Sequence, residues 1–122
     1  MFMGGKRLFV LGSDTLAGVP KARELMARSA KRYLQDAGQL IVISGEQGPA
    51  YWAAEYCRQL GVSVVERGCF VKSIAEAEQV LFWGDTRDEE LWRRVNMGVS
   101  ISMPSIGYRW CWNSMRWLLV MT

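Results

Sequence analysis

The stretch at residues 40–61, LIVISGEQGPAYWAAEYCRQLG, decides the fold, because it is typical of a buried strand, a glycine-bearing turn and a helix. Its first residues are apolar, as expected for a strand covered on both faces. Small residues at 50, 53, 54 and 57 give the helix a face that can lie close to a sheet. In open α/β folds such strand ends and helix starts meet at one edge, where backbone N–H groups face a ligand. The stretch therefore predicts where a ligand binds.

Strand and helix patterns alternate along the rest of the chain. Apolar runs predict strands at 6–12, 39–44, 62–66, 79–83 and 99–103. Helices are expected at about 22–37 and 49–60, and the capping-box pairs Ser73–Glu76 and Thr86–Glu89 predict the starts of two more. Alternation of this length is typical of right-handed βαβ units. We therefore predict an α/β fold, a Rossmann-like three-layer sandwich with a central, mainly parallel sheet of about five strands.

The 122 residues are expected to form a single domain, with a core at about 6–104 and an aromatic C-terminal extension at 105–122. The extension contains Tyr108, Trp110, Trp112 and Trp117. We expect it to pack on the core or at an interface. Completing a partner's site and stacking on nucleic-acid bases are the alternatives.

Composition excludes several classes of chemistry. The chain contains no histidine, which excludes Ser-His-Asp and Cys-His nucleophile systems and histidine metal ligands. Cys57, Cys69 and Cys111 are odd in number and lack CxxC spacing, so we expect reduced thiols in a cytoplasmic protein. No apolar run approaches the roughly 20 residues that span a bilayer. The sequence indicates no metal, no cofactor and no membrane partner.

The formal net charge of +3 is too small to indicate nucleic-acid binding. Much of the positive charge gathers on the first predicted helix. A solvated outer face is the simpler interpretation, and a weak contact with a phosphate backbone is the other. The basic residues of this helix are Lys21, Arg23, Arg28, Lys31 and Arg32.

Three loops, at 12–18, 44–49 and 84–89, should converge at the carboxyl edge of the sheet. Their glycines let a ligand approach the main chain, although a plain strand-to-helix turn also needs glycine. Phosphate, if bound, should lie near 45–48 or 12–13, where N–H groups of a helix start favour an anion, with Arg87 as a clamp. The candidate ligand-binding residues are Gly12, Ser13, Asp14, Ser44, Gly45, Glu46, Gln47, Gly48, Gly84, Asp85, Thr86 and Arg87.

Carboxylates in these loops indicate a second kind of chemistry. Glu46 repels phosphate unless it points away or binds a hydroxyl or amine of the ligand, and acidic residues often bind ribose hydroxyls. It is also a candidate acid or base. The acidic run at 85–90 suits hydroxyls or a cationic group, or it serves only to offset a helix dipole.

A second apolar stripe on the helix at 49–60 is formed by Trp52 and Tyr56, which are one turn apart. A helix that is apolar over so much of its circumference is seldom left facing water. Packing within the monomer and a homodimer interface both explain the stripe. We expect a homo-oligomer formed through this helix and the aromatic tail.

Three segments carry a family resemblance: LFVLGSD at 8–14, LIVISGEQGPAYWAAEYCRQLGV at 40–62 and VLFWGDTRDEELWRRVNMGVSISMP at 80–104. Over residues 6–104 the chain resembles the SLOG superfamily, a Rossmann-like group with LOG phosphoribohydrolases, the DprA fold and YspA-like domains. The resemblance implies binding of a nucleotide or nucleotide derivative, commonly in a homo-oligomer. Hydrolase members carry a PGGxGT-type loop and a catalytic glutamate. Here residues 83–89 lack the Gly-Thr pair, and Glu89 or Glu90 are the possible counterparts.

The function we expect is the binding or sensing of a nucleotide-derived small molecule at the carboxyl edge of the sheet. One alternative is a LOG-like N-glycosidic hydrolase acting on nucleoside monophosphates, with Glu89 or Glu46 as the catalytic residue. The second alternative is binding of single-stranded nucleic acid by the basic helix and the tryptophan-rich tail. The sequence leaves open whether the protein is an enzyme.

Overall fold

The computed structural model describes residues 5–121, in which one sheet has six strands in the order β3-β2-β1-β4-β5-β6. The first five strands run parallel to their neighbours, and β6 runs antiparallel to β5. This confirms the predicted α/β class and the mainly parallel sheet. The strands are β1 (Arg7–Gly12), β2 (Gln39–Ile43), β3 (Ser63–Arg67), β4 (Gln79–Asp85), β5 (Ser105–Cys111) and β6 (Arg116–Met121).

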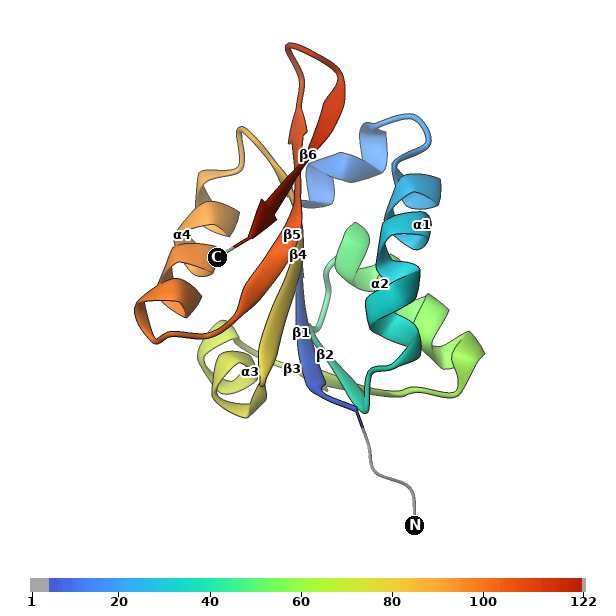
Figure 1. Ribbon diagram of the computed structural model, residues 1–122, viewed down its shortest axis with the longest axis vertical. Coiled ribbons are helices and arrows are strands. Elements are labelled where there is room, and N and C mark those ends of the chain that lie inside the picture. Colours follow the sequence, from blue (N-terminus) through green and yellow to red (C-terminus); the bar gives the residue numbers. More distant parts are fainter. Residues whose placement is uncertain (1–4, 122) are drawn as a thin grey trace.

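Helices cover both faces of the sheet, which gives three layers (Figure 1). On one face lie α1 (Ala22–Gln35) and α2 (Pro49–Leu60), and on the other lie α3 (Phe70–Glu76) and α4 (Glu89–Ser100). A short 3-10 helix, η1 (Asp14–Gly18), follows β1. Among the described residues, no helix has both the length and the apolar character needed to cross a membrane.

Two hydrophobic cores lie between the layers. Because side chains alternate along a strand, Val10 faces the core under α1 and α2, while Phe9 faces the core under α3 and α4. The small face of α2 is buried as predicted, with Ala53 and Cys57 fully covered. Gly61 ends that helix in the left-handed conformation, at φ 79°.

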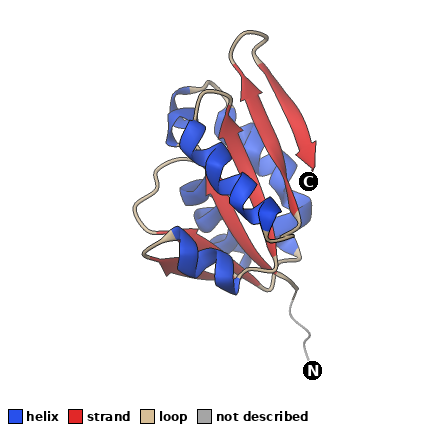
Figure 2. Cartoon of the chain, turned by 90° about the vertical axis from the view of Figure 1, so that its left-hand side faces the viewer, coloured by secondary structure: helices blue, strands red, loops and turns tan. Residues whose placement is uncertain are grey.

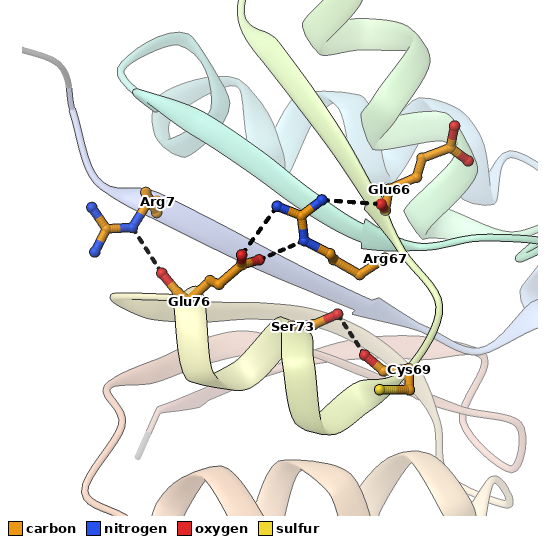
Figure 3. A network of polar contacts seen from close by, with 6 residues as sticks. All are labelled: Arg7, Glu66, Arg67, Cys69, Ser73 and Glu76. Carbon is orange, nitrogen blue, oxygen red and sulfur yellow. Dashed lines mark hydrogen bonds and ion pairs between the residues drawn. The ribbon is translucent and has the colours of Figure 1, made fainter.

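The predicted start of α3 at Ser73 is wrong. The helix begins at Phe70 after Cys69, so Ser73 lies within it and donates its hydroxyl proton to the Cys69 carbonyl oxygen at 2.8 Å (Figure 3). Glu76 does not reach back to the helix start. Its carboxylate accepts two hydrogen bonds from the Arg67 guanidinium, at 2.7 and 3.0 Å. This ion pair replaces the expected capping box.

The predicted capping box at the start of α4 is also wrong. The cap is Asp88, whose carboxylate accepts the Leu91 backbone N–H at 3.2 Å. Thr86 lies before the helix and donates its hydroxyl proton to the Trp110 carbonyl oxygen. The second residue of the expected pair, Glu89, is the first residue of α4.

The strand predicted at 99–103 is wrong, because α4 continues to Ser100 and a turn follows. Val95 and Gly98 are buried, and this packing holds the helical conformation despite the β-branched residues near its end. The fifth strand lies instead in the aromatic extension, which folds as the β5–β6 hairpin. Figure 2 shows the hairpin tip projecting beyond the helices. Residues 105–121 therefore extend the sheet.

The order of the strands creates a crevice between β1 and β4. From β1 the chain passes through α1 to β2 on one side, whereas β4 lies on the other side and leads through α4 to β5. The segments that follow β1 and β4 thus depart to opposite faces of the sheet (Figure 1). Ligands in this fold class bind where the strand order reverses in this way.

The candidate functional site

A cavity of about 750 Å³ lies at the carboxyl ends of β1 and β4, where the strand order reverses. Its floor includes Leu11 and Gly12 at the end of β1. Asp14, Glu46 and Asp85 bring in the segments that follow β1 and β2 and the end of β4. We call this cavity the acidic crevice.

Negative charge dominates the acidic crevice, whose lining holds six carboxylates and two guanidinium groups. Both cations already have partners. The Arg87 guanidinium lies 4.7 Å from the centroid of the Trp112 ring, and Arg94 Nε lies 3.2 Å from a carboxylate oxygen of Glu90. The six acidic residues are Asp14, Glu46, Asp85, Asp88, Glu89 and Glu90.

Asp85 connects three segments of the crevice and is 4% exposed. Its Oδ1 accepts the Arg87 backbone N–H and the Trp112 indole N–H, both at 2.9 Å. Its Oδ2 accepts the Thr15 hydroxyl at 2.8 Å. Burial alone would raise the pKa of Asp85, but these hydrogen bonds and the charge of Arg87 outweigh it and lower the pKa. Asp85 is therefore ionised, and its carboxylate holds these three segments together.

The pKa of Glu46 is shifted in the opposite direction from that of Asp85. Burial raises its pKa to about 7, helped by the negative charges of Asp14 and Asp88 and opposed by Arg94. Its Oε1 is buried and has no hydrogen-bond partner among the described residues. A carboxyl group with such a pKa exchanges a proton near neutral pH, which suits a general acid or base.

Five of the predicted ligand-binding residues and the candidate catalytic Glu89 line the acidic crevice: Gly12, Asp14, Glu46, Asp85, Arg87 and Glu89. The other predicted residues lie outside its lining. Ser13 is fully buried, and its hydroxyl accepts the Asp85 backbone N–H at 2.9 Å. Gly45 and Gln47 line a separate depression of about 300 Å³, which Glu46 also borders. Ser44, Gly48, Gly84 and Thr86 line neither cavity.

The amides expected to bind phosphate have a partner within the protein. Asp14 Oδ1 accepts the backbone N–H groups of Gln47 and Gly48, both at 3.1 Å. Gly48 is the N-cap residue of α2. Its glycine character has a structural explanation, since a Cβ there would lie 2.9 Å from the Ser13 carbonyl oxygen. The turn thus serves the packing of two protein segments.

Among the crevice side chains that sequence reasoning did not assign to the site are Trp112 and Arg94. Trp112 follows β5, and the alternation of aromatic residues at 108, 110 and 112 was a usable signal for a strand there. Arg94 lies one turn after Glu90 on α4, so helical spacing places both on one face. Neither residue lies in the three loops, at 12–18, 44–49 and 84–89, that were expected to form the site.

The aromatic residues proposed for an interface or for base stacking contact the protein's own core. Trp52 and Tyr56 are partly buried against the core beneath α1 and α2. Trp110 is 5% exposed and lies 5.3 Å from the Trp117 ring, centroid to centroid. Self-association and nucleic-acid binding therefore stay predictions.

No group of three or more Cys, Asp or Glu side chains within residues 5–121 is placed to hold a metal ion. What the described arrangement offers a ligand is a set of hydrogen-bond acceptors, one protonatable carboxyl group and an aromatic side chain.

No family model and no curated protein matches the sequence. Among solved structures, the chain is similar to one described as the crystal structure of E. coli MccB with succinimide, at 13% sequence identity and a TM-score of 0.47. The match covers 86% of this chain and 37% of that one.

Proposed function

We propose that the protein binds a nucleotide-derived small molecule in the acidic crevice. The observation that carries this proposal is the position of the cavity, which lies where the strand order reverses and is bordered by residues that follow three strands. Its volume of about 750 Å³ is in the range of small-molecule sites. The resemblance to the SLOG superfamily, which rests on the sequence pattern, agrees with this proposal.

The lining favours the hydroxyl-bearing or amino-bearing part of such a ligand. Ionised carboxylates accept hydrogen bonds and donate none, so they pair with ribose hydroxyls and with amino groups. Trp112 adds an aromatic side chain beside the polar groups. Such a combination of an apolar surface and a few convergent polar groups is typical of small-molecule sites.

A thermal-shift screen followed by calorimetric titration tests the proposal. Nucleosides, nucleotides, ADP-ribose derivatives and pterins are added at millimolar concentration, and at least one is expected to raise the melting temperature. If none does, the proposal is wrong.

A matched pair of variants locates the binding. Glu89 and Glu24 both lie in the first turn of a helix, but Glu24 is outside the acidic crevice. Replacing either with arginine changes the net charge equally. Glu89→Arg is expected to weaken binding several-fold, whereas Glu24→Arg leaves it unchanged.

The second candidate function is N-glycosidic hydrolysis, and the state of Glu46 favours it. Glu46 exchanges a proton near pH 7, whereas Asp85, which lines the same crevice, stays ionised. Pairs of carboxylates whose pKa values are pushed apart divide the acid and base roles in many enzymes. Here Glu46 would protonate the base as the bond from its nitrogen to the ribose carbon breaks, and Glu89 would stabilise the developing positive charge. Water would then add to the ribose carbon and return its proton to the Glu46 carboxylate.

Incubation with nucleosides and with nucleoside monophosphates, followed by chromatography for free base, tests this activity. If base is released, Glu46→Gln should lower the rate by about 10²–10⁴-fold, which is the usual contribution of general acid catalysis. Glu24→Gln, on the opposite face of the sheet from α4, serves as the control. Absence of free base rejects hydrolysis and leaves the binding proposal intact.

We also propose that the protein forms a homo-oligomer through its aromatic tail. Strand β6 is an edge of the sheet, and Leu118, Leu119 and Met121 on it are 42%, 55% and 70% exposed. The opposite edge, β3, carries Glu66 and Arg67, the kind of charged residue that blocks edge pairing. The lack of charge at 117–121 favours pairing of β6 with a second copy.

A further inference from the structure

The side chain of Asp14 occupies the place where a parallel α/β fold offers its backbone amides to an anion. Asp14 lies two residues after the end of β1, and its Oδ1 accepts the N–H groups of Gln47 and Gly48 at 3.1 Å each. Gly48 is the N-cap residue of α2, a helix of 12 residues, and Gln47 precedes it. The free N–H groups and the helix dipole at such an end favour negative charge, and ligand phosphates commonly bind there. Here the anion belongs to the protein.

The backbone segment that carries Asp14 packs closely against the start of α2. A Cβ on Gly48 would lie 2.9 Å from the Ser13 carbonyl oxygen and 3.1 Å from the Asp14 Cα, and a Cβ on Gly12 would lie 2.8 Å from the Pro49 Cβ. The two segments therefore lie in direct contact. Ser13 is held in turn by Trp83, whose carbonyl oxygen accepts the Ser13 N–H at 3.0 Å. Because Asp14 Oδ1 already accepts both amides, a phosphate can bind them only if the Asp14 carboxylate moves.

The charges of the acidic crevice also disfavour the binding of a phosphate group. A phosphate entering it would meet five carboxylates and the partly protonated Glu46, while Arg87 lies over Trp112 and Arg94 is paired with Glu90. Like charges at close range cost several kcal/mol in recognition and are a common means of rejecting the wrong ligand. The hydroxyl and amino groups of a nucleoside meet no such repulsion.

We propose that Asp14 takes the place of a ligand phosphate and thereby makes the acidic crevice selective for nucleosides that lack a phosphate group. This inference rests on the proposed binding function and specifies its ligand class. Asp14 is then a specificity-determining residue. Its carboxylate binds the two amides that a phosphate would otherwise bind, and it adds a negative charge beside them.

Titration calorimetry with pairs of ligands that differ only in the phosphate tests the inference. The probes are adenosine with AMP and guanosine with GMP, and the proteins are the wild type, Asp14→Ala and Asp14→Asn. The wild type should bind the better nucleoside at least about tenfold more tightly than its monophosphate. Asp14→Ala frees both amides and should gain affinity for the monophosphate by about tenfold or more. Asp14→Asn keeps an acceptor but loses the charge, so it should gain less.

Two controls keep the test decisive. Asp36→Ala removes an exposed carboxylate at the C-terminal end of α1, and it should leave the preference for nucleoside unchanged. Melting curves establish that each variant is folded, and Asp14→Asn provides a readout if Asp14→Ala does not fold.

Failure of the inference differs from failure of the proposed function. If the wild type binds AMP or GMP as tightly as the nucleoside, or if neither Asp14 variant gains affinity for a monophosphate or for inorganic phosphate, Asp14 does not select the ligand. If no nucleotide derivative binds the wild type at all, the proposed function is wrong. A gain of phosphate binding by Asp14→Ala would even then support the role of Asp14.

Discussion

Trp112 donates its indole N–H to Asp85 Oδ1 at 2.9 Å, which connects the turn between β5 and β6 to the end of β4. Asp85 also accepts hydrogen bonds from Thr15 after β1 and from the backbone N–H of Arg87. A single carboxylate thus joins the loops after β1 and β4 to the hairpin. The aromatic extension is therefore part of the candidate site.

The first prediction concerns this hydrogen bond. Trp112→Phe keeps an aromatic ring but removes the N–H, and a hydrogen bond to a charged group contributes about 1.5–3 kcal/mol. We expect the free energy of unfolding, measured by urea denaturation, to fall by that amount.

Trp117→Phe is the matched control, because the buried Trp117 Nε1 has no hydrogen-bond partner among the described residues. This variant loses a similar part of its ring without losing a hydrogen bond. We expect a smaller decrease in stability than for Trp112→Phe. Equal losses in the two variants would show that ring packing, and not the bond to Asp85, accounts for the effect.

The elements predicted correctly are those whose local pattern and tertiary environment agree. α2 begins at Pro49 and ends before Gly61 as expected, because proline suits a first turn and glycine a left-handed end. The buried strands of the parallel sheet are apolar on both faces, which makes them visible as continuous runs. The position of the site follows from these strands alone.

The failures arise where a distant contact overrides a local pattern. Thr86 and Glu89 have the spacing of a capping box, but Thr86 bonds to the main chain of Trp110, a partner 24 residues away. Val99 has a strand-forming side chain, yet α4 extends past it. The pairing of Asp14 with the start of α2 spans more than thirty residues and has no local signature. Such contacts decide which groups stay available to a ligand.

The second prediction concerns pH. The pKa of Glu46 is about 7 in the native protein, against 4.5 as its ordinary value. The native state therefore holds more protons than the unfolded state between these values, so stability falls as pH rises through this window. Its contribution is fully present below pH 4.5 and lost above pH 7. Glu46→Gln mimics the protonated form and should not show this loss.

Thermal melting of the wild type and Glu46→Gln, from below pH 4.5 to above pH 7, measures the effect. The variant should gain stability relative to the wild type as the pH increases. Parallel curves across the whole range would mean that Glu46 is ionised normally, and its role as an acid near neutral pH would then be lost.

The third prediction concerns self-association. Leu119→Lys places a charge on the exposed edge strand β6, where it should block pairing with a second copy. Sedimentation of the wild type over a range of concentrations should show a dimer that this variant does not form. Tyr51→Lys is the matched control, since Tyr51 is 48% exposed on α2, the helix that also carries the Trp52–Tyr56 stripe. If Tyr51→Lys dissociates the dimer and Leu119→Lys does not, the interface lies on α2.

The last prediction concerns the close approach of the segments after β1 and before α2. Gly48→Ala would place a Cβ 2.9 Å from the Ser13 carbonyl oxygen, a backbone atom that cannot move without shifting Asp14. We expect a loss of roughly 1–3 kcal/mol in the free energy of unfolding, as for other overpacked sites. Gly18→Ala is the control, because no atom lies within 4 Å of a Cβ there. That change should stay within about 0.5 kcal/mol. Equal stability of the two variants would mean that the loop after β1 can move away from α2, and the amides of Gln47 and Gly48 would then be open to a phosphate.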